Sequence, residues 1–171
     1  MDKVPEQSPR RDFAEVYAEH VFRVFGFIGY RVRGNEEAED LTQIVFEKAI
    51  RAWARYDPKL ASELTWLIAI ARNVVIDYLR QRRDAFFPGG EIPEIAAPEQ
   101  HVSERGLSPE LAAAIDRLKP REQTVLALRF GAELTGAEIA ELLGLSTDNV
   151  HQILSRSLRG LRAELDGKPT D

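Results

Sequence analysis

Apolar residues recur at helical spacing along the first half of the chain. Between positions 13 and 28 they lie three, four or seven residues apart, which places them in one stripe on a helix. The stripe consists of Phe13, Val16, Tyr17, Val21, Val24 and Ile28. Gly34-Asn35 interrupts this pattern, Asp57-Pro58 ends a second one, and a third runs from about residue 62 to residue 83. We therefore expect three helices around one small core.

The second half carries a helix-turn-helix pattern over residues 135–161, after two short helices expected near 111–118 and 121–130. Within this pattern the small Ala140 lets two helices cross closely, Gly144 gives the turn its backbone freedom, and Ser146 is placed to cap the second helix. An ordinary helical hairpin is the alternative. The joint spacing of the three residues favours the helix-turn-helix.

No segment alternates apolar and polar residues as a β-strand does, so the expected fold is all-α, with two small helical domains joined by a flexible linker. The domains are expected at residues 11–83 and 108–166. The linker between them, residues 84–107, holds three Pro and three Gly and lacks a sustained helical period.

The charge of the 171-residue chain is unevenly distributed. The net charge of −5 comes mostly from the linker, because residues 1–83 carry +1, residues 84–107 carry −4 and residues 108–171 carry −2. The negative total therefore does not exclude a nucleic-acid partner for either domain.

The composition excludes several kinds of chemistry. The absence of cysteine rules out disulfides, thiolate zinc sites and thiol catalysis, and His20, His101 and His151 lack metal-ligand spacing. A phosphate-binding glycine loop and a nucleophile elbow are also absent, so we expect no enzyme, no metal and no cofactor. Without an apolar signal segment or a stretch long enough to cross a bilayer, we expect a soluble cytoplasmic protein.

The second helix of the helix-turn-helix pattern has the side-chain chemistry of a DNA reader. Asn and Gln can pair with adenine, Asp can accept a hydrogen bond from cytosine, and Arg can reach guanine or phosphate. The residues expected to face outward are Thr147, Asp148, Asn149, His151, Gln152, Ser155, Arg156 and Arg159.

A second polar face is expected on the third helix of the first domain. Trp66, Asn73, Asp77 and Arg80 are spaced seven, four and three residues apart, which places them on one side. An amide beside an aromatic ring and a guanidinium can hold an unstacked base. The alternative places Trp66 in the core and Asn73 on a solvated face.

Three blocks of the sequence resemble one family. They read AEDLTQIVFEKAIRAWARYDP (38–58), ELTWLIAIARNVVIDYLRQRR (63–83) and LKPREQTVLALRFGAELTGAEIAELLGLSTDNVHQILSRSLRGLRAEL (118–165). In this order they resemble the extracytoplasmic-function (ECF) sigma factors, small bacterial members of the primary sigma family with domains sigma-2 and sigma-4 joined by a linker.

The resemblance implies three binding surfaces. Core RNA polymerase would dock through its β′ clamp helices on Glu39, Asp40, Gln43 and Glu47. The minus-ten promoter element would be bound and opened by Lys59, Ser62, Glu63, Trp66, Arg72, Asn73, Asp77 and Arg80, with the loop 57–65 and Asn73 forming a pocket for a flipped base. The helix-turn-helix would read the minus-thirty-five element and touch the β flap, and the acidic linker would thread toward the RNA exit path.

The same resemblance implies a protein that is monomeric when free, and an anti-sigma protein as a further partner. The sequence departs from the family pattern at DNA-facing positions: Glu63 replaces an aromatic residue, Ala69 replaces an arginine, and Ile153 and Leu158 stand where arginine is frequent. Fewer cations at these positions weaken the attraction between the protein and the DNA phosphates.

The alternative function is a stand-alone helix-turn-helix repressor or activator, which would bind a palindromic operator as a symmetric dimer.

Overall fold

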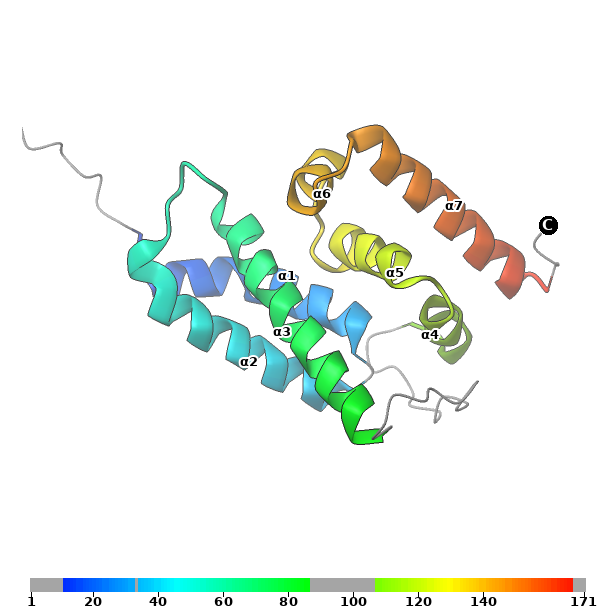
Figure 1. Ribbon diagram of the computed structural model, residues 1–171, viewed down its shortest axis with the longest axis horizontal. Helices are drawn as coiled ribbons and strands as arrows, with labels where there is room; N and C mark the ends of the chain where they lie inside the picture. Colours follow the sequence, from blue (N-terminus) through cyan, green and yellow to red (C-terminus); the bar gives the residue numbers. More distant parts are fainter. Residues whose placement is uncertain (1–10, 33, 87–106, 168–171) are drawn as a thin grey trace, which may run out of the picture.

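The computed structural model describes residues 11–32, 34–86 and 107–167, and this part of the chain contains helices and turns but no strand (Figure 1). The all-α prediction is confirmed. In chain order the elements are α1 (Phe13–Arg31), α2 (Asn35–Ala52), the 3₁₀ turn η1 (Trp53–Arg55), α3 (Glu63–Phe86), α4 (Pro109–Asp116), α5 (Pro120–Leu126), the π-helical turn η2 (Ala127–Gly131), α6 (Gly136–Leu143) and α7 (Thr147–Leu165).

Helices α1, α2 and α3 form the predicted N-terminal group. The Asp12 side chain caps α1 by accepting a hydrogen bond from the Ala14 N–H at 3.2 Å. Glu36 and Glu37 lie in the first turn of α2, where the helix dipole favours acidic groups. Helix α3 continues to Phe86, three residues past the expected boundary at position 83. Most of the predicted linker, residues 87–106, lies outside the described residues.

The helix-turn-helix forms where the sequence predicts it. Thr135 and Glu138 make a reciprocal capping box at the start of α6, with Thr135 Oγ1 accepting from the Glu138 N–H at 3.3 Å. Gly144 ends α6 with φ at 65°, a left-handed conformation that a residue without Cβ adopts easily. Ser146 Oγ accepts from the Asn149 N–H at 3.1 Å and caps α7. The start of α6, the end of α6 and the start of α7 are therefore each specified by a residue at that position.

The two helix groups share one continuous apolar core. Buried side chains of α1 and α3 lie in the same cluster as those of η2, α6 and α7, and α1 packs directly against η2 (Figure 1). Ile28, Leu67, Leu128 and Ile139 are each completely buried in this cluster. One small core was expected for the first three helices, and the packing of α1 on η2 extends that core into the second helix group. A second, smaller cluster in the second group contains Ala114, Ile115, Leu126 and Leu161. None of the described helices is both long enough and apolar enough to cross a membrane.

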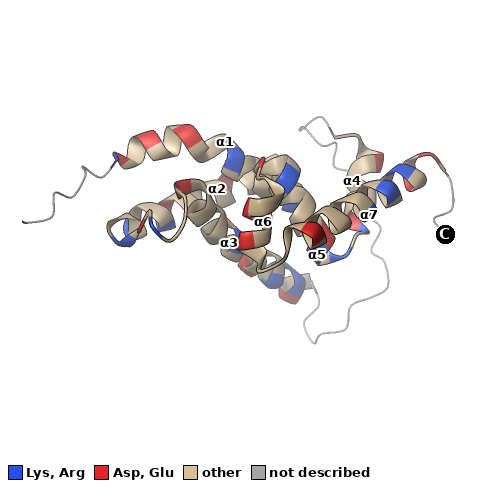
Figure 2. Ribbon diagram, turned by 90° about the horizontal axis from the view of Figure 1, so that it is seen from above, with Lys and Arg blue, Asp and Glu red and all other residues tan. Residues whose placement is uncertain are grey.

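Basic and acidic residues alternate along the helices, so that both signs are interspersed (Figure 2). The basic end of α3, which includes Arg82 and Arg83, and the basic positions of α7 stand out among them. Arg82 and Arg83 are exposed, so the basic end of α3 faces solvent.

Candidate nucleic-acid and protein interfaces

Helix α7 presents the predicted recognition face to solvent. All eight residues expected to face outward, from Thr147 to Arg159, are exposed, while Val150, Ser157 and Leu161 on the opposite side are buried. The face therefore has the amide, hydroxyl and guanidinium groups that read base edges and bind phosphate.

His151 differs from the rest of this face because its ring lies over the start of α6. A Cβ placed on Gly136 would lie 2.6 Å from Nε2 of His151. The absence of a side chain at position 136 makes room for the imidazole. His151 therefore packs across the two helices of the motif, although the residue as a whole remains exposed.

Helix α3 presents a second polar face. Asn73, Asp77 and Arg80 are exposed on it, and Arg72 is half-buried. The Arg80 guanidinium donates a hydrogen bond to Asp77 Oδ1 at 2.5 Å, which holds the two charged groups together one turn from Asn73. The Asn73 side chain is thus exposed on the same helix as a paired Asp77 and Arg80.

Trp66 belongs to an aromatic cluster that joins this face to the end of α2. Its ring centroid lies 5.8 Å from that of Trp53 and 5.0 Å from that of Tyr56, and Trp53 stacks on Tyr56 at 4.9 Å. Trp66 is half-buried. It therefore packs against the core, as the alternative interpretation held, and keeps part of its surface accessible beside the loop that precedes α3.

That loop, residues 57–62, is held by hydrogen bonds at both ends. The Tyr56 hydroxyl donates to the Ala61 carbonyl at 2.8 Å, and Asp57 Oδ1 accepts from the Lys59 N–H at 2.9 Å. Ser62 Oγ accepts from the Thr65 N–H at 3.2 Å. Lys59 and Ser62 are exposed, so the predicted minus-ten residues of the loop face solvent on an ordered backbone.

Glu63, another member of the predicted minus-ten set, is bound within the protein to residues of α1 and just before it. Arg11 donates to its Oε2 at 2.7 Å, His20 Nε2 lies 3.4 Å from the same oxygen, and the Glu63 side chain is 16% exposed. Arg11 also donates to Glu19 at 2.7 Å, and this hydrogen bond lowers the pKa of Glu19. The Glu63 carboxylate is thus directed toward α1.

The same contacts bring together a set of possible metal ligands that sequence spacing could not reveal. The ligand atoms of Glu19, His20 and Glu63 lie within 4.8 Å of one another. The Arg11 guanidinium bridges both carboxylates and compensates part of their negative charge. We interpret this cluster as an arginine-bridged ion-pair network that ties the start of α3 to α1.

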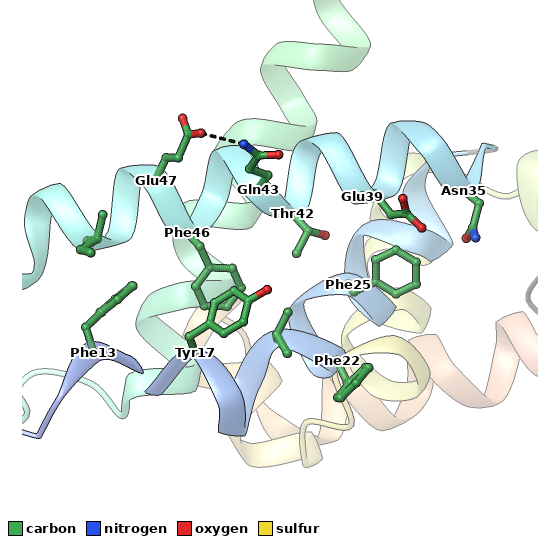
Figure 3. Close-up of a pocket in the computed structure, with 12 residues that line it drawn as sticks. Phe13, Tyr17, Phe22, Phe25, Asn35, Glu39, Thr42, Gln43, Phe46 and Glu47 are labelled. Carbon is green, nitrogen blue, oxygen red and sulfur yellow. Dashed lines mark hydrogen bonds between the residues drawn. The ribbon is translucent and has the colours of Figure 1, made fainter. Parts of the chain in front are cut away.

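Helix α2 carries the predicted polymerase-docking residues on its outer side. Glu39, Asp40, Gln43 and Glu47 are all exposed, and Gln43 Nε2 donates to Glu47 Oε1 at 3.1 Å (Figure 3). Three acidic groups on one helix favour a basic partner surface.

An apolar groove of about 800 Å³ lies beside these residues, between α1 and α2 (Figure 3). Aromatic side chains line it, and Glu39, Gln43 and Glu47 form its polar edge. Its aromatic lining consists of Phe13, Tyr17, Phe22, Phe25 and Phe46. Tyr17, which the helical stripe places in the core, is 47% exposed here, and Phe22 is 81% exposed. The sequence signal that could have indicated the groove is Phe22, an aromatic residue outside the predicted stripe.

The fold and these faces define a two-domain helical DNA-binding protein, and family comparisons identify its class. Residues 16–85 match Sigma-70 region 2 and residues 114–163 match Sigma-70 region 4. The chain is 30% identical over 164 residues to the RNA polymerase sigma factor YlaC of Bacillus subtilis, covering 91% of this chain and 93% of YlaC. This chain belongs to the ECF group of RNA polymerase sigma factors. The comparisons give no support to a stand-alone repressor.

Another relative is longer than this chain. The ECF RNA polymerase sigma factor BldN of Streptomyces coelicolor is 31% identical over 154 residues, which cover 87% of this chain but 58% of BldN. Among solved structures, the sigma factor RpoE in complex with the anti-sigma factor NepR from Bartonella quintana has a TM-score of 0.70 at 19% identity, covering 91% of this chain and 97% of that one. The similarity to RpoE extends over both helix groups and shows the shared fold.

Proposed function

We propose that this sigma factor docks on the β′ clamp helices of core RNA polymerase through α2, reads the minus-thirty-five element through α7, and binds and opens the minus-ten element through α3 and the loop before it. One observation carries the proposal. A single chain presents two exposed polar faces of DNA-reading chemistry, on α3 and α7, and a separate acidic face on α2. Each face suits one of the three tasks.

The docking step is supported by the chemistry of α2 and its groove. Glu39, Asp40 and Glu47 supply negative charge, and the aromatic groove beside them supplies apolar surface. Interfaces commonly combine an apolar centre with a polar rim. A basic, amphipathic helical element such as a polymerase clamp helix fits both features. The β flap is proposed to contact the sigma-4 helices α4–α7, away from the recognition face.

The promoter-opening step is supported by the environment of Asn73. Extruding a base from the stack costs a few kcal/mol, which hydrogen bonds to the base edge and an aromatic contact can offset. Asn73 offers an accessible amide, and Trp66 and the ordered loop lie toward the start of the same helix. We infer that Lys59, Arg72 and Arg80 attract the strand backbone, while Glu63 acts by fixing the start of α3 to α1.

The proposed division of work needs no catalytic group in this chain, because the polymerase performs nucleotide transfer. We also propose that the protein acts in the cytoplasm and is a monomer when free. An anti-sigma protein is a further proposed partner, since the similar fold of RpoE was solved in complex with one. The acidic segment 84–107 is proposed to approach the RNA exit path.

The experiment that tests the proposal is reconstitution with core polymerase. The purified chain is mixed with core enzyme, the complex is isolated by size exclusion, and run-off transcription is measured on a library of randomised promoters. Selective enrichment of templates that share two separated sequence elements is the expected result. Absence of a complex, or transcription that does not depend on template sequence, contradicts the proposal.

A further inference from the structure

One histidine of the recognition face lies against the neighbouring helix of the motif. A Cβ placed on Gly136, the first residue of α6, would lie 2.6 Å from Nε2 of His151, 3.1 Å from Cδ2 and 3.6 Å from Cε1. The edge of the imidazole that carries Nε2 therefore faces the α6 backbone. A side chain at position 136 would push the ring aside, so glycine at this position is what allows the contact.

The ring rests at the positive end of a helix. Helix α6 begins at Gly136, and the first N–H groups of an α-helix have no acceptor within the helix. The aligned peptide dipoles add partial positive charge at the same end, which favours anions and disfavours cations. The position on Gly136 therefore suits a neutral imidazole better than an imidazolium.

Charged groups approach this region from α6, α1 and α7. On α6, the Glu138 carboxylate accepts from the N–H and the hydroxyl of Thr135 at 2.7 and 2.8 Å. The hydrogen bond from the Thr135 N–H lowers the pKa of Glu138, and the positive charge of Arg23 on α1 adds to this effect. On α7, Asp148 lies three residues before His151 and is exposed. Within the described residues, the imidazole forms no ion pair with either carboxylate.

The place of His151 in the motif favours a contact with the DNA backbone. His151 is exposed, as are its neighbours Gln152 and Ser155 on α7. In helix-turn-helix complexes the recognition helix lies in the major groove, and the first helix crosses the sugar-phosphate backbone. A side chain between these two helices lies at the wall of the groove, where phosphates are within reach. An imidazolium can pair with a phosphate, and a neutral imidazole offers no charge for this.

We propose that His151 is a proton-linked phosphate contact. The neutral ring packs on Gly136 in the free chain, and the protonated ring leaves this position to pair with a backbone phosphate of the bound upstream element. The proposal rests on the proposed function, because α7 must enter the DNA before a phosphate can approach.

The proposal has a definite sign. A phosphate favours the protonated ring, so the bound state holds more protons than the free state, and by reciprocity protons favour binding. Histidine is the side chain that ordinarily changes charge between about pH 5 and pH 8. Binding to the upstream element should therefore tighten as the pH falls through this range.

The test compares the wild type with His151→Gln, which cannot be charged, and His151→Lys, which stays charged. Each full-length chain is assembled with core polymerase, and its affinity for a duplex that carries the upstream element is measured from about pH 6 to about pH 8. Affinities are expressed relative to His151→Gln at each pH, which cancels any pH dependence of the polymerase. Since residue 151 is exposed, both variants should fold.

We expect the wild type to match His151→Gln near pH 8 and His151→Lys near pH 6. The Lys variant should bind about threefold to fivefold more tightly than the Gln variant, the range of an exposed ion pair. Because the contact is to phosphate, this ratio should be the same for every upstream sequence and should decrease as salt rises.

A pair of glycine variants tests the resting position of the ring. Gly136→Ala displaces the imidazole, whereas a Cβ on Gly160 of α7 meets nothing within 4 Å. Without the position that favours the neutral ring, Gly136→Ala should move the pH dependence of binding to higher pH. Gly160→Ala should leave it at the wild-type value.

Three outcomes overturn the proposal. The first is the same pH dependence for the wild type and His151→Gln, and the second is a loss in His151→Gln that depends on the upstream sequence. The third is an unchanged pH dependence in Gly136→Ala, which would show that the contact with α6 has no part in the effect. Failure of the proposed function is distinguishable, because the wild-type holoenzyme would then prefer no upstream sequence at any pH.

Discussion

The hydroxyl of Tyr56 donates a hydrogen bond of 2.8 Å to the carbonyl of Ala61, across the loop that leads into α3. Tyr56 is 7% exposed, and burial raises the pKa of its hydroxyl, which therefore stays protonated and able to donate. This bond ties the residue after η1 to the end of the loop that precedes α3. Together with the hydrogen bonds made by Asp57 and Ser62, it orders the backbone of the proposed base pocket.

Replacing Tyr56 with Phe should impair promoter opening with little effect on polymerase docking. The change removes one hydrogen bond worth about 1 kcal/mol and leaves the aromatic packing intact. We expect a several-fold slower appearance of permanganate-reactive thymines. Tyr30→Phe is the matched control, because Tyr30 is a half-buried residue of α1 that lies outside both the loop and the groove. Equal rates for Tyr56→Phe and the wild type would show that the loop is ordered by other contacts.

Replacing Asp40 and Gln43 together with Ala should weaken binding to core polymerase. Both side chains are exposed on the outer face of α2, so the fold should be unaffected. Lys48→Ala, an exposed change on another side of the same helix, should bind normally. Affinity is measured by titration of labelled core enzyme, and wild-type affinity in the double variant would place the docking surface elsewhere.

Gln152→Ala and Arg156→Ala should each alter recognition of the upstream element. Loss of a bidentate base contact costs about 1–3 kcal/mol and relaxes specificity at one position. Arg162→Ala, in the last turn of the same helix, controls for loss of general positive charge. The readout is binding of the holoenzyme to a panel of upstream sequences. If Gln152→Ala weakened binding equally to every upstream sequence, Gln152 would position the helix and would not read a base.

Replacing Asn73 with Ala should leave polymerase docking and upstream recognition intact while impairing open-complex formation. The amide is exposed on α3, so its loss should not perturb the core. A pre-melted bubble template should restore part of the activity, since the strands are then already apart. Opening at the wild-type rate on duplex DNA would contradict a role of Asn73 in melting.

Glu138→Gln should destabilise the helix-turn-helix at neutral pH. The Thr135 N–H donates to the Glu138 carboxylate at 2.7 Å, and this hydrogen bond lowers the pKa of Glu138 below its ordinary value of 4.5. A depressed pKa in the folded state stabilises the fold above that ordinary value, and the benefit disappears as pH falls through the folded pKa.

We expect Glu138→Gln to lower the free energy of unfolding by about 0.5–2 kcal/mol at neutral pH, as loss of a cap does. The difference from the wild type should shrink as the pH falls below 4.5, measured by denaturant unfolding across pH. A difference that does not change with pH would mean that the carboxylate charge is not what stabilises the cap.

The helix-turn-helix could be predicted from sequence because its turns are set by local chemistry. Gly144 supplies a left-handed residue and Ser146 supplies a cap, and both effects act within a few residues of the chain. The exposed face of α7 follows from the same helical period. The family resemblance added the docking and melting roles, which no spacing rule provides.

The close approach of Gly26 to Gly131 and the groove could not be predicted, because both depend on segments that are far apart in the chain. Gly26 lies within an ordinary helix, and only the fold brings Gly131 against it. Likewise, Tyr17 fits the apolar stripe of α1, but α2 does not cover that edge of the helix, so the ring lines a groove. The pairing of Arg11 with Glu63 needs the packing of α1 on α3.

The aromatic cluster at the end of α2 also gives the protein a built-in optical reporter. The chain has two tryptophans, Trp53 and Trp66, and their ring centroids are 5.8 Å apart beside the loop of residues 57–62. Their intrinsic fluorescence therefore samples one small region of sigma-2 and does not sample α7. Stacking of an extruded base near Trp66 should quench this emission, so capture of the melted strand can be followed in real time without any label.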